Sequence, residues 1–167
     1  MAINFPEGTQ AFPARCLNYN AATKTNTQYH SSTTWTDVSG LSVTITPRST
    51  ASVFLVSGHV NVGADGDSCC NFRLLRNGTT IANANSAGNR TTAHTTTSYS
   101  PTGGYNMEGV GIGHLDSPGT TSAVTYKIQC NQSDTSGTGM FINYISNTTD
   151  DVWVSRATSH IAILELQ

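Results

Sequence analysis

The feature that most constrains this chain is the alternation of apolar and polar residues within residues 34–62. In the first half, Leu41, Val43 and Ile45 alternate with serine or threonine, which is the two-residue period of a strand with one dry and one wet face. The sequence PRST then interrupts the pattern, because proline fixes φ and donates no hydrogen bond to a ladder. A longer apolar run, rich in β-branched residues, follows at residues 52–62. We predict two long strands around one turn at the centre of a β-sandwich.

Shorter segments with the same period occupy the rest of the chain. The clearest is FRLLRNGTTIA, where Asn77-Gly78 predicts a two-residue hairpin turn because both positions need positive φ. Residues 122–131 alternate cleanly, and residues 159–166 are predicted to form a buried strand that is apolar on both faces. Further short strands are predicted at residues 14–19, 25–30, 90–99, 140–145 and 152–154.

These segments indicate an all-β protein, since turn signals recur about every 8–12 residues and no stretch has amphipathic helical spacing. We predict one jelly-roll or β-sandwich domain over residues 14–167, with about eight to ten antiparallel strands. Within it, Gly109, Gly111 and Gly113 alternate with valine and isoleucine. A stripe without side chains predicts close approach by another backbone or by a bulky ring.

Residues 1–13 (MAINFPEGTQAFP) are predicted to form an extended N-terminal arm. Phe5 and Phe12 are large apolar groups on a segment too short to have a core of its own. Together with Pro6 and Pro13 they are predicted to anchor the arm against the domain, a neighbouring subunit or another protein surface.

Charge and cysteine content exclude several classes of function. Charged residues make up only 11% of the chain, well below the roughly 25% of an ordinary soluble domain, and the net charge of −2 gives no attraction to nucleic acid. No window approaches a membrane span, and the first residues lack a signal-peptide pattern, so we expect synthesis in a reducing cytosol. The four cysteines are therefore predicted to be free thiols; Cys69 and Cys70 are adjacent and would point to opposite faces of a strand.

Five segments of this chain together resemble a known group of proteins. They are, in order, MAINFPEGTQAFP, TWTDVSGLSVTITPRSTASVFLV, FRLLRNGTTIA, LDSPGTTSAVTYKIQ and SHIAILEL. The chain resembles virion proteins of tailed phages, often cyanophages and other aquatic phages, which are similar to tumour-necrosis-factor-like jelly rolls. Each motif is only a strand and a turn, and the ordered set covers most of the chain.

The resemblance implies a homotrimer on the exterior of the phage particle, assembled in the host cytoplasm. Its partner would be the major capsid protein for a capsid decoration or cement protein, and fibre or tail proteins for a tail-fibre or head-fibre knob. Fibre proteins usually carry an N-terminal shaft, whereas only about a dozen residues precede the first predicted strand here. We therefore expect a decoration protein seated on the capsid through its arm.

Enzyme signatures are missing from the sequence, and we expect neither catalysis nor a cofactor. There is no nucleophile elbow, zinc-protease motif, phosphate-binding loop or Cys-x-x-Cys pair. Asp65 and Asp67 could offer oxygen ligands for calcium, but the segment lacks the further carboxylate and carbonyl spacing of a dedicated loop, so a plain turn is the favoured interpretation. A three-fold axis could gather three copies of His59 or His114 around a metal or an anion; a hydrogen-bonded interior histidine is the commoner alternative.

Large apolar and aromatic residues are the remaining candidates for binding. We assign to the core or to the trimer interface Trp35, Tyr126, Trp153, Ile161 and Ile163. The alternative function is a receptor-binding knob that recognises a host surface glycan, with contacts from Tyr99, Tyr105 and Tyr144. An enzyme that cleaves envelope polysaccharide is a third and weaker hypothesis.

Overall fold

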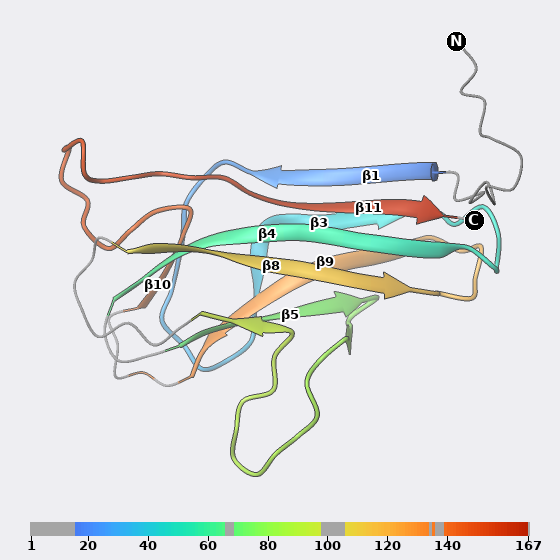
Figure 1. The fold of residues 1–167 in the computed structure, drawn as a ribbon, viewed down its shortest axis with the longest axis horizontal. Coiled ribbons are helices and arrows are strands. Elements are labelled where there is room, and N and C mark those ends of the chain that lie inside the picture. Colours follow the sequence, from blue (N-terminus) through green and yellow to red (C-terminus); the bar gives the residue numbers. More distant parts are fainter. Residues whose placement is uncertain (1–15, 66–68, 98–105, 134, 136–138, 167) are drawn as a thin grey trace, which may run out of the picture.

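The strands of this protein form two antiparallel sheets that pack face to face (Figure 1). The structure is a computed structural model, and it describes residues 16–65, 69–97, 106–133, 135 and 139–166. These residues form eleven strands and no helix. This described part of the chain therefore contains no helix that could cross a membrane.

The larger sheet contains six strands in the order β1-β11-β4-β10-β2, with β8 paired to the other edge of β4. Their bounds are β1 (Cys16–Lys24), β2 (Gln28–His30), β4 (Val53–Asp65), β8 (Met107–Asp116), β10 (Gly139–Ile142) and β11 (Ser159–Leu166). Because β11 pairs with the first half of β4 and β10 with its second half, the sheet is four strands wide along its length.

The smaller sheet has the order β3-β9-β5-β6, with β7 beside β6 on the same edge of β5. Its strands are β3 (Thr36–Ile45), β5 (Cys70–Arg76), β6 (Thr79–Ile81), β7 (Thr95–Thr96) and β9 (Val124–Gln132). The two long strands predicted at the centre therefore do not pair with each other. The turn between them carries the chain from the smaller sheet into the larger one.

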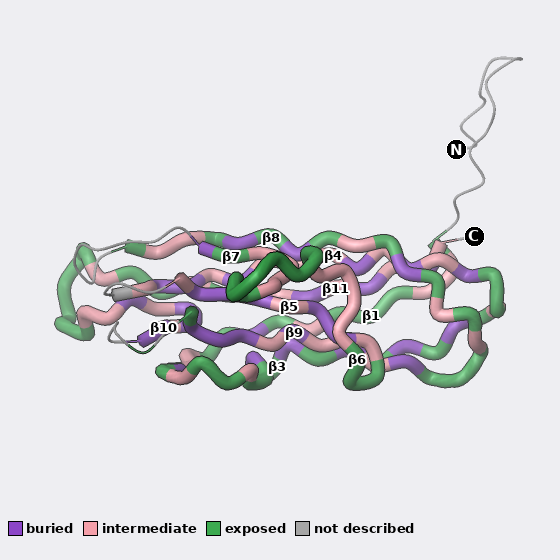
Figure 2. Tube along the Cα trace, turned by 90° about the horizontal axis from the view of Figure 1, so that it is seen from below, coloured by how far each residue is buried: buried purple, intermediate pink, exposed green. Residues whose placement is uncertain are grey.

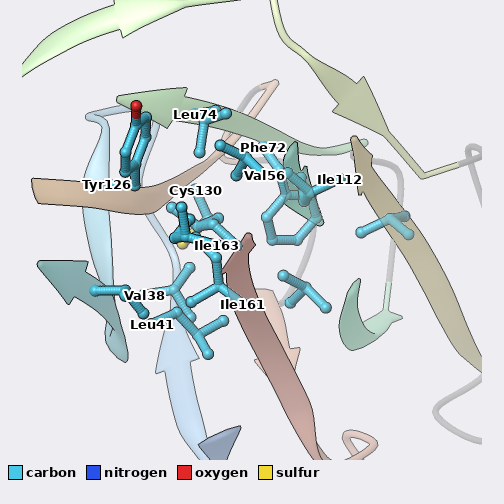
Figure 3. Close-up of a cluster of buried hydrophobic side chains, with 14 of the residues drawn as sticks. Val38, Leu41, Val56, Phe72, Leu74, Ile112, Tyr126, Cys130, Ile161 and Ile163 are labelled. Atoms are coloured by element: carbon cyan, nitrogen blue, oxygen red, sulfur yellow. The ribbon is translucent and has the colours of Figure 1, made fainter. Parts of the chain in front are cut away.

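The hydrophobic core lies between the two sheets and follows the predicted alternation (Figure 3). On β9, Val124, Tyr126, Ile128 and Cys130 are all buried, as the period of two requires. Facing them from the larger sheet are Phe54 and Val56 of β4, Ile112 of β8, and Ile161 and Ile163 of β11. Burial of one side of each strand can be followed along the chain in Figure 2.

Several local predictions are confirmed. The hairpin turn lies at Asn77 and Gly78, whose φ values of 48° and 83° are those of the expected turn type. The strand predicted within residues 25–30 is β2, and the four cysteines are free. The all-β class with two antiparallel sheets is also confirmed.

Three predictions need correction. Residues 152–154 form a turn instead of a strand, because the preceding loop is held by its own local hydrogen bonds and the chain pairs only at Arg156. Of the predicted 90–99 strand, which the structure describes as far as residue 97, Thr95–Thr96 alone form a strand paired with β5. Strand β11 is apolar on both faces, but its outward side chains are half-buried, because no described element covers that face.

Candidate functional site

The outward face of the larger sheet carries a row of large apolar side chains. Tyr19 of β1, Leu164 of β11, Leu55 of β4 and Leu115 of β8 are consecutive cross-strand partners, so they form one line across four strands. Tyr19 is 74% exposed and Leu115 is 61% exposed, while the two central leucines are half-buried. We call this line the leucine row. Exposed apolar residues scattered singly are ordinary, whereas a contiguous row is not.

The next line of side chains along the strands is small. Ala21, Ala162, Ser57 and Gly113 are consecutive partners across the same four strands. A Cβ added at Gly111 or Gly113 would meet no atom within 4 Å. The close approach that the glycine stripe predicts is therefore not made by the described residues of this chain, and the surface beside the leucine row is flat and uncovered.

A pair of histidines forms the third line. His160 of β11 lies directly opposite His59 of β4, flanked by Thr23 of β1 and Gly111 of β8. The two imidazole rings meet edge to face, with 4.4 Å between their centroids. Burial, and secondarily the neighbouring His59, lower the pKa of His160. Near neutral pH His160 is therefore predominantly uncharged.

We call these three lines together the outer face, and it contains no Asp, Glu, Lys or Arg. Four strands spaced about 4.8 Å apart, with three lines that take up about six residues of each strand at about 3.3 Å each, make a surface of about 19 Å by 20 Å, or roughly 380 Å². Two such faces in contact would bury on the order of 760 Å², which is most but not all of the roughly 1,000 Å² expected of a specific interface.

The predicted core and interface residues lie in different environments. Tyr126, Ile161 and Ile163 are fully buried between the sheets. Trp35, just before β3, is half-buried with the guanidinium of Arg73 4.4 Å from its ring centroid, a cation–π contact. Trp153 is 75% exposed and does not belong to the core, because its turn projects away from both sheets.

Tyr144 is the one predicted glycan-contacting residue that the structure describes. It is half-buried and packs edge to face against Phe141, which in turn contacts Tyr29. Six predicted site residues lie outside the described part of the chain, namely Phe5, Pro6, Phe12, Pro13, Tyr99 and Tyr105.

The described residues show no arrangement typical of metal binding or nucleophilic catalysis. No three His, Cys, Asp or Glu side chains among them gather as metal ligands. Burial raises the pKa of both Cys70 and Cys130 to about 12, so neither thiol is activated as a nucleophile. His114 is half-buried on β8, and Asp67 of the proposed calcium loop lies outside the described residues.

Sequence reasoning missed the leucine row. Tyr19, Leu55, Leu115 and Leu164 come from four distant segments, and only the strand register brings them into line. The available signal was the C-terminal strand, whose apolar residues at consecutive positions left no polar face for solvent.

No protein-family model matches this chain, and a search of curated proteins finds no relative. The class of protein therefore follows from the fold and the outer face. It is a two-sheet antiparallel β-protein with an uncharged, largely apolar surface over one sheet.

Proposed function

We propose that this protein is a non-enzymatic structural component of a phage virion, a homotrimeric decoration or cement protein that binds and stabilises the exterior of the capsid. The observation that supports self-association is the uncharged outer face with its leucine row. The virion, the capsid and the number three rest on the sequence resemblance.

A second copy of this chain is the occupant that best fits the outer face. Two uncharged faces can meet without like-charge repulsion, whereas a charged partner would leave its own groups desolvated and unpaired. The open glycine positions on β8 would admit the backbone or a ring of the neighbouring copy. Closed symmetry would also cover the apolar surface that a lone protomer exposes to solvent.

We further infer that the sandwich is a jelly roll. Treating β1 with β2 and β10 with β11 as two interrupted lines, and β6 with β7 as one edge, gives two sheets of four lines each. Eight lines in two antiparallel sheets is the number expected of a jelly roll. The chain crosses repeatedly between the two sheets, for example after β3 and again on both sides of β9, which favours this topology over two separate meanders.

The capsid contact is assigned to the N-terminal arm of residues 1–13. Cys16 pairs with Leu166, so the arm joins the domain at the end where β11 finishes. Many weak arm contacts, multiplied over a symmetric lattice, would reinforce the shell through avidity.

The self-association part is tested by placing a charge on the leucine row. Leu115→Lys and Tyr19→Lys change side chains that are exposed in the single chain, so the fold should tolerate them. We expect each variant to sediment as a monomer, because three lysines would be desolvated around the axis. Ser42→Lys, exposed on the smaller sheet, is the matched control and should remain trimeric. Trimers of both leucine-row variants would refute this interface.

The virion part is tested by labelling the protein on phage particles. Hundreds of copies over the head would support decoration, and a few copies at the tail would support the fibre knob instead. Deleting residues 1–12 should abolish binding to capsids while leaving the trimer folded. If the truncated protein still decorates shells, the arm is not the capsid contact.

A further inference from the structure

Residues 144–156 form a loop whose two ends are joined. Tyr144 and Arg156 pair as an isolated antiparallel bridge, and the amide of Ala157 donates to the carbonyl of Asn143 (3.1 Å). Compact surface loops with closed ends are frequently functional. In Figure 1 this loop lies at the opposite end of the sandwich from the C-terminus.

Asn143 fixes the base of this loop to the larger sheet. Its side chain is fully buried and donates to the carbonyls of Lys24 (2.8 Å) and Asn26 (3.1 Å). Its Oδ1 accepts from the hydroxyl of Ser159 (2.5 Å), and that hydroxyl accepts from the amide of Asn61 (2.9 Å). These bonds tie the loop to β1, β4 and β11, so its geometry is supported by rigid elements.

The loop is also ordered from within. Asn147 Oδ1 accepts from the amide (2.9 Å) and the hydroxyl (2.8 Å) of Thr149. The amide of Asp151 donates to the carbonyl of Thr149, and the amide of Val154 donates to the carbonyl of Asp151 (3.0 Å each). Such local bonds hold the backbone in successive turns.

A pocket of about 460 Å³ lies in this loop. It is lined by the ring of Tyr144 and by polar side chains that include Asn147, Asp150, Asp151 and Arg156. The volume falls within the roughly 300–1,000 Å³ of small-molecule sites. Its lining is more polar than that of a typical apolar pocket, which selects a ligand that carries many hydroxyl or amide groups.

The charged groups of this pocket have no partner in the described part of the chain. Asp150, Asp151 and Arg156 line one cavity, yet none of their side chains makes a hydrogen bond or an ion pair with another described residue. Two carboxylates supply acceptors and one guanidinium supplies donors. Trp153, 75% exposed, belongs to the same loop but does not line the pocket, so Tyr144 supplies its aromatic side chain.

We propose that the loop 144–156 is a saccharide-binding site for a neutral pyranose ring. A pyranose presents hydroxyl donors and acceptors around its edge, matching the carboxylates, Asn147 and Arg156, and an apolar C–H face that can pack on Tyr144. Two carboxylates against one guanidinium disfavour polyanions such as nucleic acid. The site is built from one chain and does not require the trimer, so it stands independently of the proposed decoration function.

The test uses Trp153 as its own reporter. Trp35 is the only other tryptophan, so a Trp35→Phe protein emits from Trp153 alone. We expect titration with methyl glycosides of glucose, galactose and N-acetylglucosamine to shift or quench this emission for at least one sugar, with a dissociation constant on the order of 1 mM. No change with any of the three up to 100 mM would overturn the proposal.

Variants of the full chain locate the site by calorimetry. Asp150→Asn with Asp151→Asn should weaken binding of the sugar identified above at least tenfold, and Tyr144→Leu should weaken it several-fold. Leu115→Lys lies outside the loop and should bind as the wild type does, whether or not it is a trimer. Wild-type affinity in the double asparagine variant would contradict the proposal, as would tighter binding of glucuronate than of glucose.

Discussion

At the scale of single residues, Asp116 is the most strongly bonded charge in the described structure. It is 8% exposed at the end of β8 and accepts two hydrogen bonds from Arg76 Nη1 (2.7 and 2.8 Å) and one from the Tyr126 hydroxyl (2.5 Å). Burial, followed by the bond to Asp116, raises the pKa of Tyr126, so the phenol remains a donor. A buried carboxylate is tolerated here because its oxygens have partners.

The Asp116 cluster gives a graded stability prediction. Tyr126→Phe removes one hydrogen bond and should reduce the free energy of unfolding by about 1–2 kcal/mol. Asp116→Ala leaves the Tyr126 hydroxyl buried without its acceptor and Arg76 without its counter-charge, and should cost about 3–5 kcal/mol. Urea denaturation measures both. Equal costs for the two variants would show that the carboxylate does not organise the cluster.

At the scale of elements, the hairpin between β5 and β6 is fixed by its turn and by a neighbouring strand. Gly78 has φ of 83°, where a side chain is strained. The amide of Asn77 donates to the carbonyl of Thr125, and Asn77 Oδ1 accepts from the Thr125 amide (2.8 Å each). The turn therefore also aligns β5 with the start of β9.

Replacing the turn glycine separates backbone strain from side-chain volume. Gly78→Ala should lower the free energy of unfolding by about 1 kcal/mol, since alanine disfavours positive φ. Gly111→Ala is the control, because Gly111 has no positive φ and open space around it, and it should not destabilise the monomer. Thermal unfolding of both, in a Leu115→Lys background, measures the difference. If the two alanines had the same effect, positive φ would not be the constraint.

Elements with a local signal could be predicted from the sequence, and features set by register could not. The strand β9 and the Asn77-Gly78 turn are encoded by neighbouring residues. The loop 144–156 could not be predicted for two reasons. Val152 and Val154 flank Trp153 with the spacing of a strand, so the local pattern predicts the wrong structure. The hydrogen bond that fixes the loop joins Asn143 and Ser159, which are far from one another in sequence. A lone Asn carries no sign of such a role.

At the scale of the whole molecule, the His59–His160 pair would make the trimer sensitive to pH. Within the described residues, the cross-strand neighbours of the pair carry no charge: β8 presents Gly111 and β1 presents Thr23. The pKa of His160 is lowered in the folded chain, so the unfolded protein binds a proton more readily, and this contribution to the free energy of unfolding is fully present above the ordinary histidine pKa of about 6.5. It is lost as pH falls from about 6.5 through the lowered value. Burial of the pair in an interface would lower the pKa of His160 further and couple the same proton to dissociation.

We therefore expect the trimer to persist at pH 8 and to dissociate increasingly between pH 6.5 and pH 5. Protonation of His160, whose ring centre lies 4.4 Å from that of His59, would place a positive charge within an uncharged interface. Light scattering after size exclusion follows the mass across this range. The double variant His59→Gln, His160→Gln should keep one mass throughout, and a pH response that survives in it would assign the effect to other groups.

The outer face connects the fold with the proposed function, because a sheet with apolar side chains on both sides needs a partner that covers it. The most direct test is the molecular mass in solution at pH 8, measured by sedimentation equilibrium. Three copies of 17.7 kDa predict about 53 kDa for the wild type. A single species of 17.7 kDa at concentrations up to about 100 μM would contradict self-association through this face.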